Sequence, residues 1–194
     1  MHDIHYLRDF VKKKKCTLLG VGPMSKNVVD ATISLSDKYK VPLILIASRR
    51  QIDSFKLGGG YVENWTTEKY ASYIKKKTKK NNIILARDHG GPWQSNVELN
   101  NNYSSHKAMK SAKESFAIDI DNGFKIIHID PSIFPKNEKI NKDKIIDRLF
   151  ELYEFCYEYA QLKKKKILFE VGTEEQSGST NSQKEIEYNL FRLK

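Results

Sequence analysis

Five short apolar runs alternate with segments of helical periodicity along the 194-residue chain, and this alternation limits the folds that the chain can adopt. The apolar runs span 16–22, 41–48, 82–88, 124–130 and 166–172. They are rich in leucine, isoleucine or valine with little polar alternation, which is typical of strands buried on both faces. The segments with helical spacing span 25–39, 66–80, 108–123 and 141–166. This order predicts parallel strands joined by crossover helices.

The flanking residues support the predicted elements. Ser25, Thr66 or Thr67, and Asn141 precede helical segments and are expected to cap their N-termini, and Gly123 is expected to end the third helix in a left-handed conformation. Polar and glycine-rich segments follow the strands. Because parallel α/β folds carry their chemistry at the carboxyl ends of the strands, we expect the functional site at that end of the sheet.

The fold class that follows is α/β, of the parallel (β/α) TIM-barrel type. We expect one domain over residues 1–194. A complete barrel has eight βα units in about 250 residues, and this chain shows five, so the barrel is expected to be incomplete. The chain is then the N-terminal part of a longer family pattern or is completed by a partner, since open sheet edges favour association.

The net charge of +10 raises the question of a nucleic-acid partner. The densest lysine runs form three clusters, 12–15, 75–80 and 163–166. Each cluster lies between a helix-like segment and a strand, where cations interact favourably with the helix dipole. This end of the sheet is opposite the expected site, and aromatic residues do not interleave with the lysines. We therefore expect no nucleic-acid binding.

The remaining composition indicates a protein of a reducing compartment. No run approaches the roughly 18 apolar residues of a membrane span, and we expect no membrane association. The N-terminus lacks the apolar core of a secretory signal, and the two cysteines, Cys16 and Cys156, lie in unrelated contexts. The expected localisation is cytoplasmic.

Titratable residues lie at the predicted carboxyl ends of three strands. Asp88 and His89 end the third strand, Asp130 the fourth and Glu170 the fifth, so these four side chains are expected to converge. Such a set suits a divalent metal ion such as zinc. Two alternatives stay open: a hydrogen-bonded turn at 88–89, or acids neutralised by Arg49, Arg50 and Arg87 without a metal.

The segment "GVGPMS" offers a competing hypothesis. It follows a strand and opens a helix, and "SRR" ends the next strand, as in an NADP-binding oxidoreductase. However, Ser25 stands where the dinucleotide fingerprint requires glycine or alanine, and Pro23 stiffens the turn. A plain tight turn is the preferred interpretation.

Several motifs together resemble a known family. In order and spacing, "GVGPMSKNVVDATI", "LILIASRRQID" followed by "GGGYVENWTTEKYASYI", "ILARDHGGPWQ", "GFKIIHIDPS" and "FEVGTEE" are similar to the non-catalytic subunit of class II D-tagatose-1,6-bisphosphate aldolase. The combination of "QID", "GGGY" and "DHGGPWQ" is the most specific part. That family is similar in turn to class II fructose- and tagatose-bisphosphate aldolases, which are TIM barrels that use a divalent metal to stabilise an enediolate.

The resemblance implies roles for individual residues. Asp88 would be the proton donor, His89 a metal ligand, and Asp130 and Glu170 the acids near the metal. The residues expected to bind substrate are Arg50, Gln51, Arg87 and Gly172. The two arginines would bind a substrate phosphate or, alternatively, replace the metal by neutralising the acids.

The function expected from the resemblance is metal-assisted retro-aldol cleavage of a ketose bisphosphate. The substrate would be a phosphorylated sugar, and the chain would work with a homo- or hetero-oligomeric partner such as a catalytic aldolase subunit. The alternatives are a non-catalytic stabilising subunit without a metal and, less favoured, the NADP-binding oxidoreductase.

Overall fold

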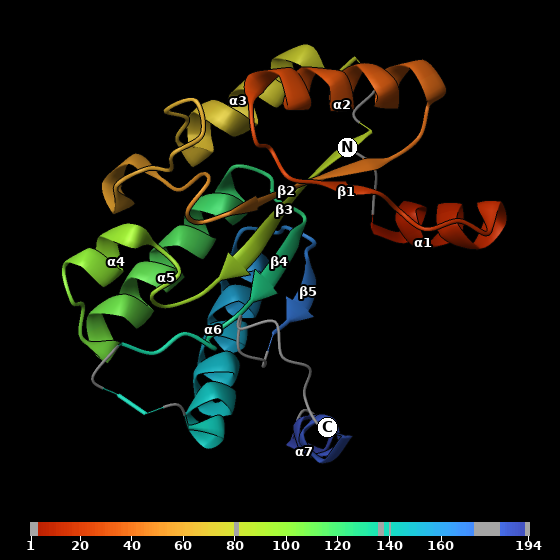
Figure 1. Cartoon of the computed structure of the whole chain (residues 1–194). Coiled ribbons are helices and arrows are strands. Elements are labelled where there is room, and N and C mark those ends of the chain that lie inside the picture. Colours follow the sequence, from red (N-terminus) through yellow and green to blue (C-terminus); the bar gives the residue numbers. More distant parts are fainter. Residues whose placement is uncertain (1–3, 80–81, 136–137, 140, 173–182, 193–194) are drawn as a thin grey trace.

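The computed structural model of the chain describes residues 4–79, 82–135, 138–139, 141–172 and 183–192 (Figure 1). Five strands form a single sheet: β1 (Gly20–Val21), β2 (Leu43–Ser48), β3 (Ile83–Gly90), β4 (Ile126–Ile129) and β5 (Leu168–Val171). The α-helices are α1 (Ile4–Lys14), α2 (Lys26–Tyr39), α3 (Thr67–Lys77), α4 (Asn96–Asn100), α5 (Ser105–Asp121), α6 (Lys142–Leu162) and α7 (Gln183–Arg192). A short 3-10 helix, η1 (Phe55–Leu57), lies between β2 and α3.

The strands pair in parallel and in sequence order, from β1 to β5. Each strand therefore lies beside the strand that precedes it, as in a (β/α) barrel. The protein has an α/β fold that resembles part of a TIM barrel, which confirms the predicted fold class. A dinucleotide-binding fold instead reverses its strand order and binds its cofactor at the reversal. The described sheet has no such reversal, which argues against the NADP-binding alternative.

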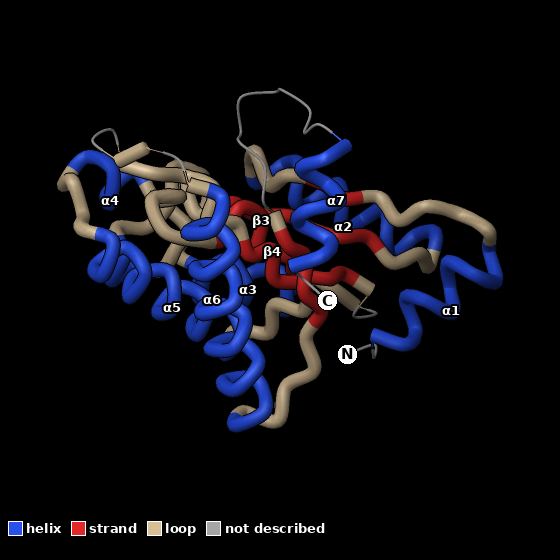
Figure 2. Tube along the Cα trace, turned by 90° about the horizontal axis from the view of Figure 1, so that it is seen from below, coloured by secondary structure: helices blue, strands red, loops and turns tan. Residues whose placement is uncertain are grey.

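The principal helices cover one face of the sheet, and Figure 2 shows α5 and α6 side by side next to the strands. Alternate strand residues point toward this layer, because successive side chains in a strand project to opposite faces. Leu45, Ala47, Ile127 and Ile129 are all fully buried there, in a cluster that includes Phe116 of α5. Burial of this continuous apolar layer is the main source of the fold's stability.

The other face of the sheet is more open. Ile44 and Ile46 of β2 and Ile126 of β4 are only partly buried, and Leu168 of β5 is 37% exposed. This face also presents Ser48 and His128. It corresponds to the inward side of a barrel, and its polar end is where the strands finish.

The local structure confirms the predicted caps. Ser25, Thr66 and Asn141 accept hydrogen bonds at the N-termini of α2, α3 and α6. Gly123 follows the cap of α5 with a φ of 88°, a left-handed value that glycine adopts readily. The first strand is shorter than predicted, and neither α4 nor α7 was anticipated; α4 has five residues, too few to show a helical period.

The described lysines of the three clusters lie where the sequence placed them, in or just after the last turns of α1 and α3 and just after α6. They are thus at the amino ends of the strands. Among the described residues, no helix combines the length and the apolar character that crossing a membrane requires.

Truncation of a core residue on α6 should show how much this helix contributes to stability. Leu149 is 1% exposed, so Leu149→Ala is expected to lower the free energy of unfolding by about 2–5 kcal/mol through lost burial and a cavity. Leu162, on the same helix, is 76% exposed, so Leu162→Ala is the matched control. It is expected to change the free energy of unfolding by less than about 0.5 kcal/mol. Urea denaturation measures both, and equal effects would contradict the helix packing described above.

Candidate functional site

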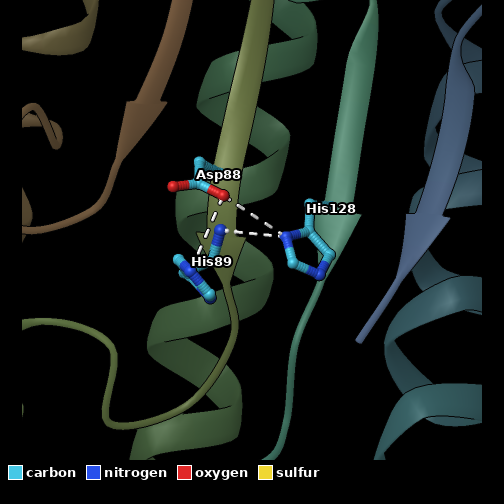
Figure 3. Close-up of side chains that lie close together, drawn as sticks. All are labelled: Asp88, His89 and His128. Carbon is cyan, nitrogen blue, oxygen red and sulfur yellow. Dashed lines mark hydrogen bonds and ion pairs between the residues drawn. The ribbon is translucent and has the colours of Figure 1, made fainter. Parts of the chain in front are cut away.

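The end of β3 is irregular, and this irregularity builds the site. The pairing of β3 with β4 shifts register between Arg87 and Gly90, and His89 has a left-handed φ of 42°. Consecutive residues of a regular strand point to opposite faces, but a bulge can re-aim a side chain. As a result Asp88 and His89 approach the same neighbour, His128 of β4 (Figure 3).

Asp88, His89 and His128 form a compact cluster. The Asp88 Oδ1 atom lies 3.5 Å from His128 Nδ1 and 3.8 Å from His89 Nε2. The backbone N–H of His89 donates to His128 Nδ1 at 3.3 Å. Each residue offers one ligand atom, and these atoms lie within 4.8 Å of one another. Within the described part of the chain, these three side chains lie close enough together to share a metal ion.

Asp130 supports this cluster from behind. Its Oδ2 atom lies 2.6 Å from His89 Nδ1 and accepts a hydrogen bond from Gln94 Nε2 at 2.9 Å. Its Oδ1 atom accepts the Ser132 N–H at 3.1 Å. The Asp130 side chain is 3% exposed. With Nδ1 bonded to Asp130, His89 turns its Nε2 edge toward Asp88, an arrangement common around metal-binding histidines.

The charges in the cluster shift the pKa values of its members. The hydrogen bond to Asp130 raises the pKa of His89, with partial burial and the charge of Arg50 acting in the opposite direction. For Asp88, burial opposes ionisation, but the neighbouring imidazoles of His128 and His89 lower its pKa overall. At neutral pH the carboxyl group of Asp88 is therefore ionised and able to accept a cation or a proton.

Two predicted site residues flank the cluster on β5. Glu170 pairs in register with His128, so the two share the open face of the sheet, and Glu170 is exposed. Gly172 is buried, and a Cβ atom there would lie 2.5 Å from His128 Nε2. A side chain at Gly172 would displace the imidazole. The remainder of the "FEVGTEE" motif, from Thr173, lies outside the described residues.

Two more predicted residues lie at the end of β2. Arg50 is exposed and close enough for its charge to act on His89. Gln51 accepts the Ser48 N–H through Oε1 at 2.9 Å, and its Nε2 atom contacts Met24 Sδ at 3.0 Å. Gln51 therefore joins the ends of β1 and β2, and no described contact links it to His89.

Arg87 does not lie in the site, contrary to the prediction that it binds substrate. It occupies the helix-facing side of β3, with its side chain fully buried. Two of its nitrogens donate to Asp119 of α5 at 2.7 and 2.6 Å, and NH1 donates to the carbonyl oxygens of Ala47 and Ile52. All these partners hold it away from the open face.

Arg49 and Arg87 do not neutralise the strand-end acids Asp88 and Asp130, contrary to that part of the hypothesis. Arg49 pairs with Asp53 and Glu98, both buried, and Arg87 pairs with Asp119. Asp88 and Asp130 have histidine partners instead.

His128 was not predicted as a site residue. The signal was present, because His128 and Asp130 are two residues apart in a predicted strand and so share a face. The motif "HID" was interpreted through its aspartate alone.

The sequence as a whole matches a family model described as D-tagatose-1,6-bisphosphate aldolase subunit GatZ/KbaZ-like, over residues 6–189. The chain belongs to this family. A comparison with curated proteins gave no match. The family match confirms the resemblance that the motifs indicated, and it covers β1 to β5 and their connecting helices.

Two solved structures share the fold of this GatZ/KbaZ-like chain. A probable tagatose 6 phosphate kinase from Sinorhizobium meliloti 1021 superposes with a TM-score of 0.73 at 17% identity, over 91% of this chain and 43% of that one. The YdjI aldolase from Escherichia coli K12 gives a TM-score of 0.58 at 13% identity, over 99% of this chain and 61% of that one. The chain thus spans about half the length of these two proteins, and at such identities the likeness shows the fold alone.

The contact between His89 and Asp130 should make stability depend on pH in a defined direction. Asp130 raises the folded-state pKa of His89 above the unfolded value of about 6.5, so protonated His89 favours folding. This contribution is complete below about pH 6.5 and is lost as the pH rises through the raised folded-state pKa. Asp130→Asn removes it, so the variant should lose more stability relative to wild type at about pH 5.5 than at about pH 9.

Urea denaturation of the metal-free proteins at the two pH values measures this difference. The bonds of Asp130 to Gln94 and Ser132 contribute at both pH values and cancel in the comparison. A stability loss of the same size at both would show that His89 and Asp130 do not interact as an ion pair.

Proposed function

We propose that this chain is a metal-binding, aldolase-related subunit that takes part in the retro-aldol cleavage of a ketose bisphosphate. The observation that carries the proposal is the convergence of Asp88, His89 and His128 at the carboxyl ends of β3 and β4. Two imidazoles and a carboxylate form a common ligand set for catalytic zinc, which leaves a further position for substrate or water. The family description, which names an aldolase subunit, supports the reaction class.

The residues present fit a divalent ion such as zinc. His89 and His128 would supply nitrogen ligands and Asp88 an oxygen ligand, and the imidazole of His89 is held in place by Asp130. Glu170, exposed beside His128, is available as a further acid. A bound ion would act as a Lewis acid that polarises a carbonyl oxygen and stabilises the enediolate.

The geometry favours a supporting role for Asp130 over direct ligation. Its oxygens already accept hydrogen bonds from His89, Gln94 and Ser132, and its carboxylate is buried. A carboxylate in this position increases the basicity of the imidazole and fixes its orientation. We therefore assign the metal to the other three side chains and the alignment of His89 to Asp130.

Asp88 has two proposed roles that compete. The resemblance makes it a proton donor, which requires a raised pKa, whereas the neighbouring histidines lower its pKa in the metal-free site. An ionised Asp88 suits a ligand or a proton acceptor. We assign Asp88 to the metal in the resting site, and proton donation to a carbonyl stays a prediction.

The proposed substrate is a phosphorylated sugar, recognised at the strand ends. Arg50 is an exposed cation close to His89, and an arginine there can bind a phosphate through two parallel hydrogen bonds. Gln51, bonded to Ser48, lies at the end of β2, and Gly172, packed against His128, lies at the end of β5. We place the protein in the cytoplasm, where phosphorylated sugars are metabolised.

A second candidate function is a stabilising subunit for a separate catalytic aldolase chain. The family description, which names a subunit, favours it, as does the partly exposed apolar face of the sheet. In this case Asp88, His89 and His128 would form hydrogen bonds only, and the chain would not bind a metal.

Metal binding separates the two candidates. We expect one Zn²⁺ or Co²⁺ per chain, with His128→Ala and His89→Ala each weakening binding by at least about 100-fold through loss of a ligand. Binding should also weaken on acidification through the raised pKa of His89, because protons compete for the imidazole. Isothermal titration calorimetry measures both effects.

The matched control is His106→Ala. His106 is an exposed histidine on α5 that belongs to no cluster in the described structure, and its removal should leave the affinity unchanged. Wild-type protein that binds no metal, or binding that survives both substitutions, would leave the stabilising subunit as the better account.

Activity measurements test the proposed reaction. The purified chain alone is expected to cleave tagatose 1,6-bisphosphate weakly or not at all, and addition of a catalytic aldolase subunit is expected to raise the rate. A coupled assay that detects the triose phosphate products measures cleavage. Fast, metal-dependent cleavage by the chain alone would overturn the need for a partner.

A further inference from the structure

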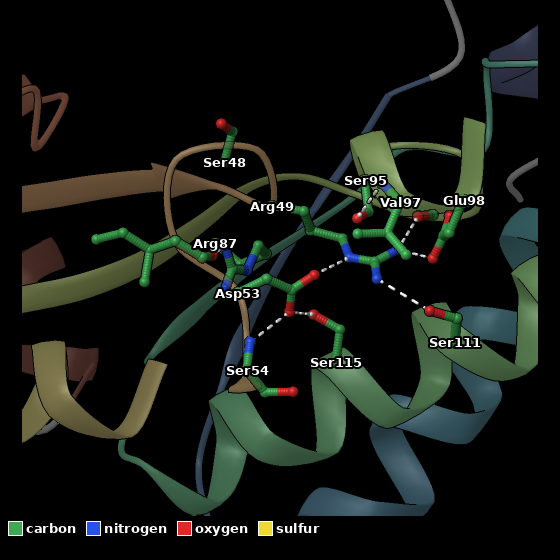
Figure 4. A network of polar contacts seen from close by, with 12 residues as sticks. Ser48, Arg49, Asp53, Ser54, Arg87, Ser95, Val97, Glu98, Ser111 and Ser115 are labelled. Carbon is green, nitrogen blue, oxygen red and sulfur yellow. Dashed lines mark hydrogen bonds and ion pairs between the residues drawn. The ribbon is translucent and has the colours of Figure 1, made fainter. Parts of the chain in front are cut away.

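A buried arginine lies close to the site without belonging to it. Arg49 follows β2, and its side chain is fully buried. Figure 4 shows its guanidinium group between Asp53, Glu98 and Ser111. Nε donates to Asp53 at 2.8 Å, NH1 to Glu98 at 2.7 Å and NH2 to Ser111 at 3.1 Å. NH1 also donates to the carbonyl oxygen of Gly91 at 2.8 Å.

The bond to Gly91 matters because the loop after β3 is conformationally unusual. Trp93 within this loop and His89 just before it have left-handed φ values of 57° and 42°, which residues other than glycine rarely adopt. Such conformations persist only where the surroundings hold them. Glu98 provides a second contact to the loop, because its Oε2 atom accepts the Trp93 N–H at 2.5 Å. Arg49 and Glu98 thus hold the loop together.

The same loop supports Asp130 and, through it, His89. Gln94 follows Trp93 directly, and its Nε2 atom donates to Asp130 Oδ2 at 2.9 Å and to the Asp130 carbonyl oxygen at 3.2 Å. At Gly91 a Cβ atom would lie 2.1 Å from the same carbonyl oxygen, so the loop backbone packs directly against Asp130. A continuous series of contacts therefore joins the buried arginine to the imidazole.

We propose that Arg49 is a positioning residue that, with Glu98, holds the loop 90–94 against Asp130 and so fixes the orientation of His89. Neither residue would touch a metal or a substrate. The effect on metal binding rests on the proposed function, whereas the effect on the contact between His89 and Asp130 does not.

The chemistry of arginine suits this role. Its planar guanidinium group presents five N–H donors in a fixed arrangement, and here these reach two carboxylates, a hydroxyl and a backbone carbonyl at once. Lysine carries the same charge on a single nitrogen and cannot span these partners together. Arg49→Lys therefore preserves the charge but removes the geometry.

The test compares variants that act on the loop with one that does not. Arg49→Lys and Glu98→Gln disturb the bonds to Gly91 and Trp93. Glu98→Gln keeps the arginine, so it decides the outcome if Arg49→Lys fails to fold. Ser111→Ala is the matched control, because it removes a partner of Arg49 on α5 and leaves the loop contacts in place. Near-ultraviolet circular dichroism shows which variants retain the fold.

The first readout is the proton NMR signal of the His89 Nδ1–H in metal-free protein, identified by its loss in His89→Gln. A hydrogen bond to a buried carboxylate should give wild type a resolved downfield signal. We expect it to persist in Ser111→Ala and to broaden or vanish in both loop variants. A signal that persists in the folded loop variants, or that is absent from wild type, would overturn the proposal.

The second readout is the Co²⁺ absorption spectrum and dissociation constant. Disturbed support of a ligand typically weakens metal binding by about 10–100-fold, and altered d–d bands would report a changed ligand geometry, which a loss of stability alone does not produce. Wild type that fails to bind Co²⁺ would count against the proposed function, and the NMR signal would still decide the positioning role. If wild type binds Co²⁺, unchanged affinity and spectra in both loop variants would contradict the positioning role.

Discussion

The contact between His89 and Asp130 is the interaction on which the site depends. It joins β3 to the end of β4, and it exists because the bulge at the end of β3 brings His89 to the same side as Asp88. In a regular strand the imidazole would point into the helix layer. Gly90 and Gly91 make the close approach possible, since a Cβ atom at Gly90 would lie 2.8 Å from the His128 carbonyl oxygen. A local backbone irregularity thus converts a strand end into a possible ligand set.

The two faces of β3 carry opposite kinds of chemistry. Arg87 and Asp119 form a buried ion pair on the helix side, where the cost of removing both charges from water is offset by several well-formed hydrogen bonds. On the open side, Asp88 and the histidines are partly exposed and can exchange protons or bind a cation. The rigid, buried face keeps the strand in place, and the exposed face is where ligands can approach.

Much of the fold was predictable from the sequence, because it follows from periodicity. The alternation of apolar runs and helical segments predicted parallel strands and crossover helices. The caps Ser25 and Asn141 were identified correctly, and Thr66 was one of two candidates for the cap of α3. The sequence also predicted that side chains at the strand ends come together, and Asp88, His89 and Asp130 do converge. These features depend on local chemistry that a single sequence records.

The orientation of the site residues depends on strand pairing, which cannot be read from the sequence. A bulge is set by the pairing of two strands, so neither the shared side of Asp88 and His89 nor the opposite orientation of Arg87 could be established from their order in the chain. Strict alternation of side chains along β3 would have placed His89 on the helix-facing side, which is wrong. His128 was within reach of the sequence, since it shares a strand face with Asp130, but its importance becomes clear only when β3 and β4 are paired.

X-ray absorption spectroscopy of the zinc-loaded protein tests the central claim most directly, because it identifies the atoms bound to the metal. The account predicts two imidazole nitrogens and one or more carboxylate or water oxygens, with one imidazole lost in His89→Gln and one in His128→Gln. A protein that takes up no zinc, or a metal whose ligands are unchanged by both substitutions, would contradict it.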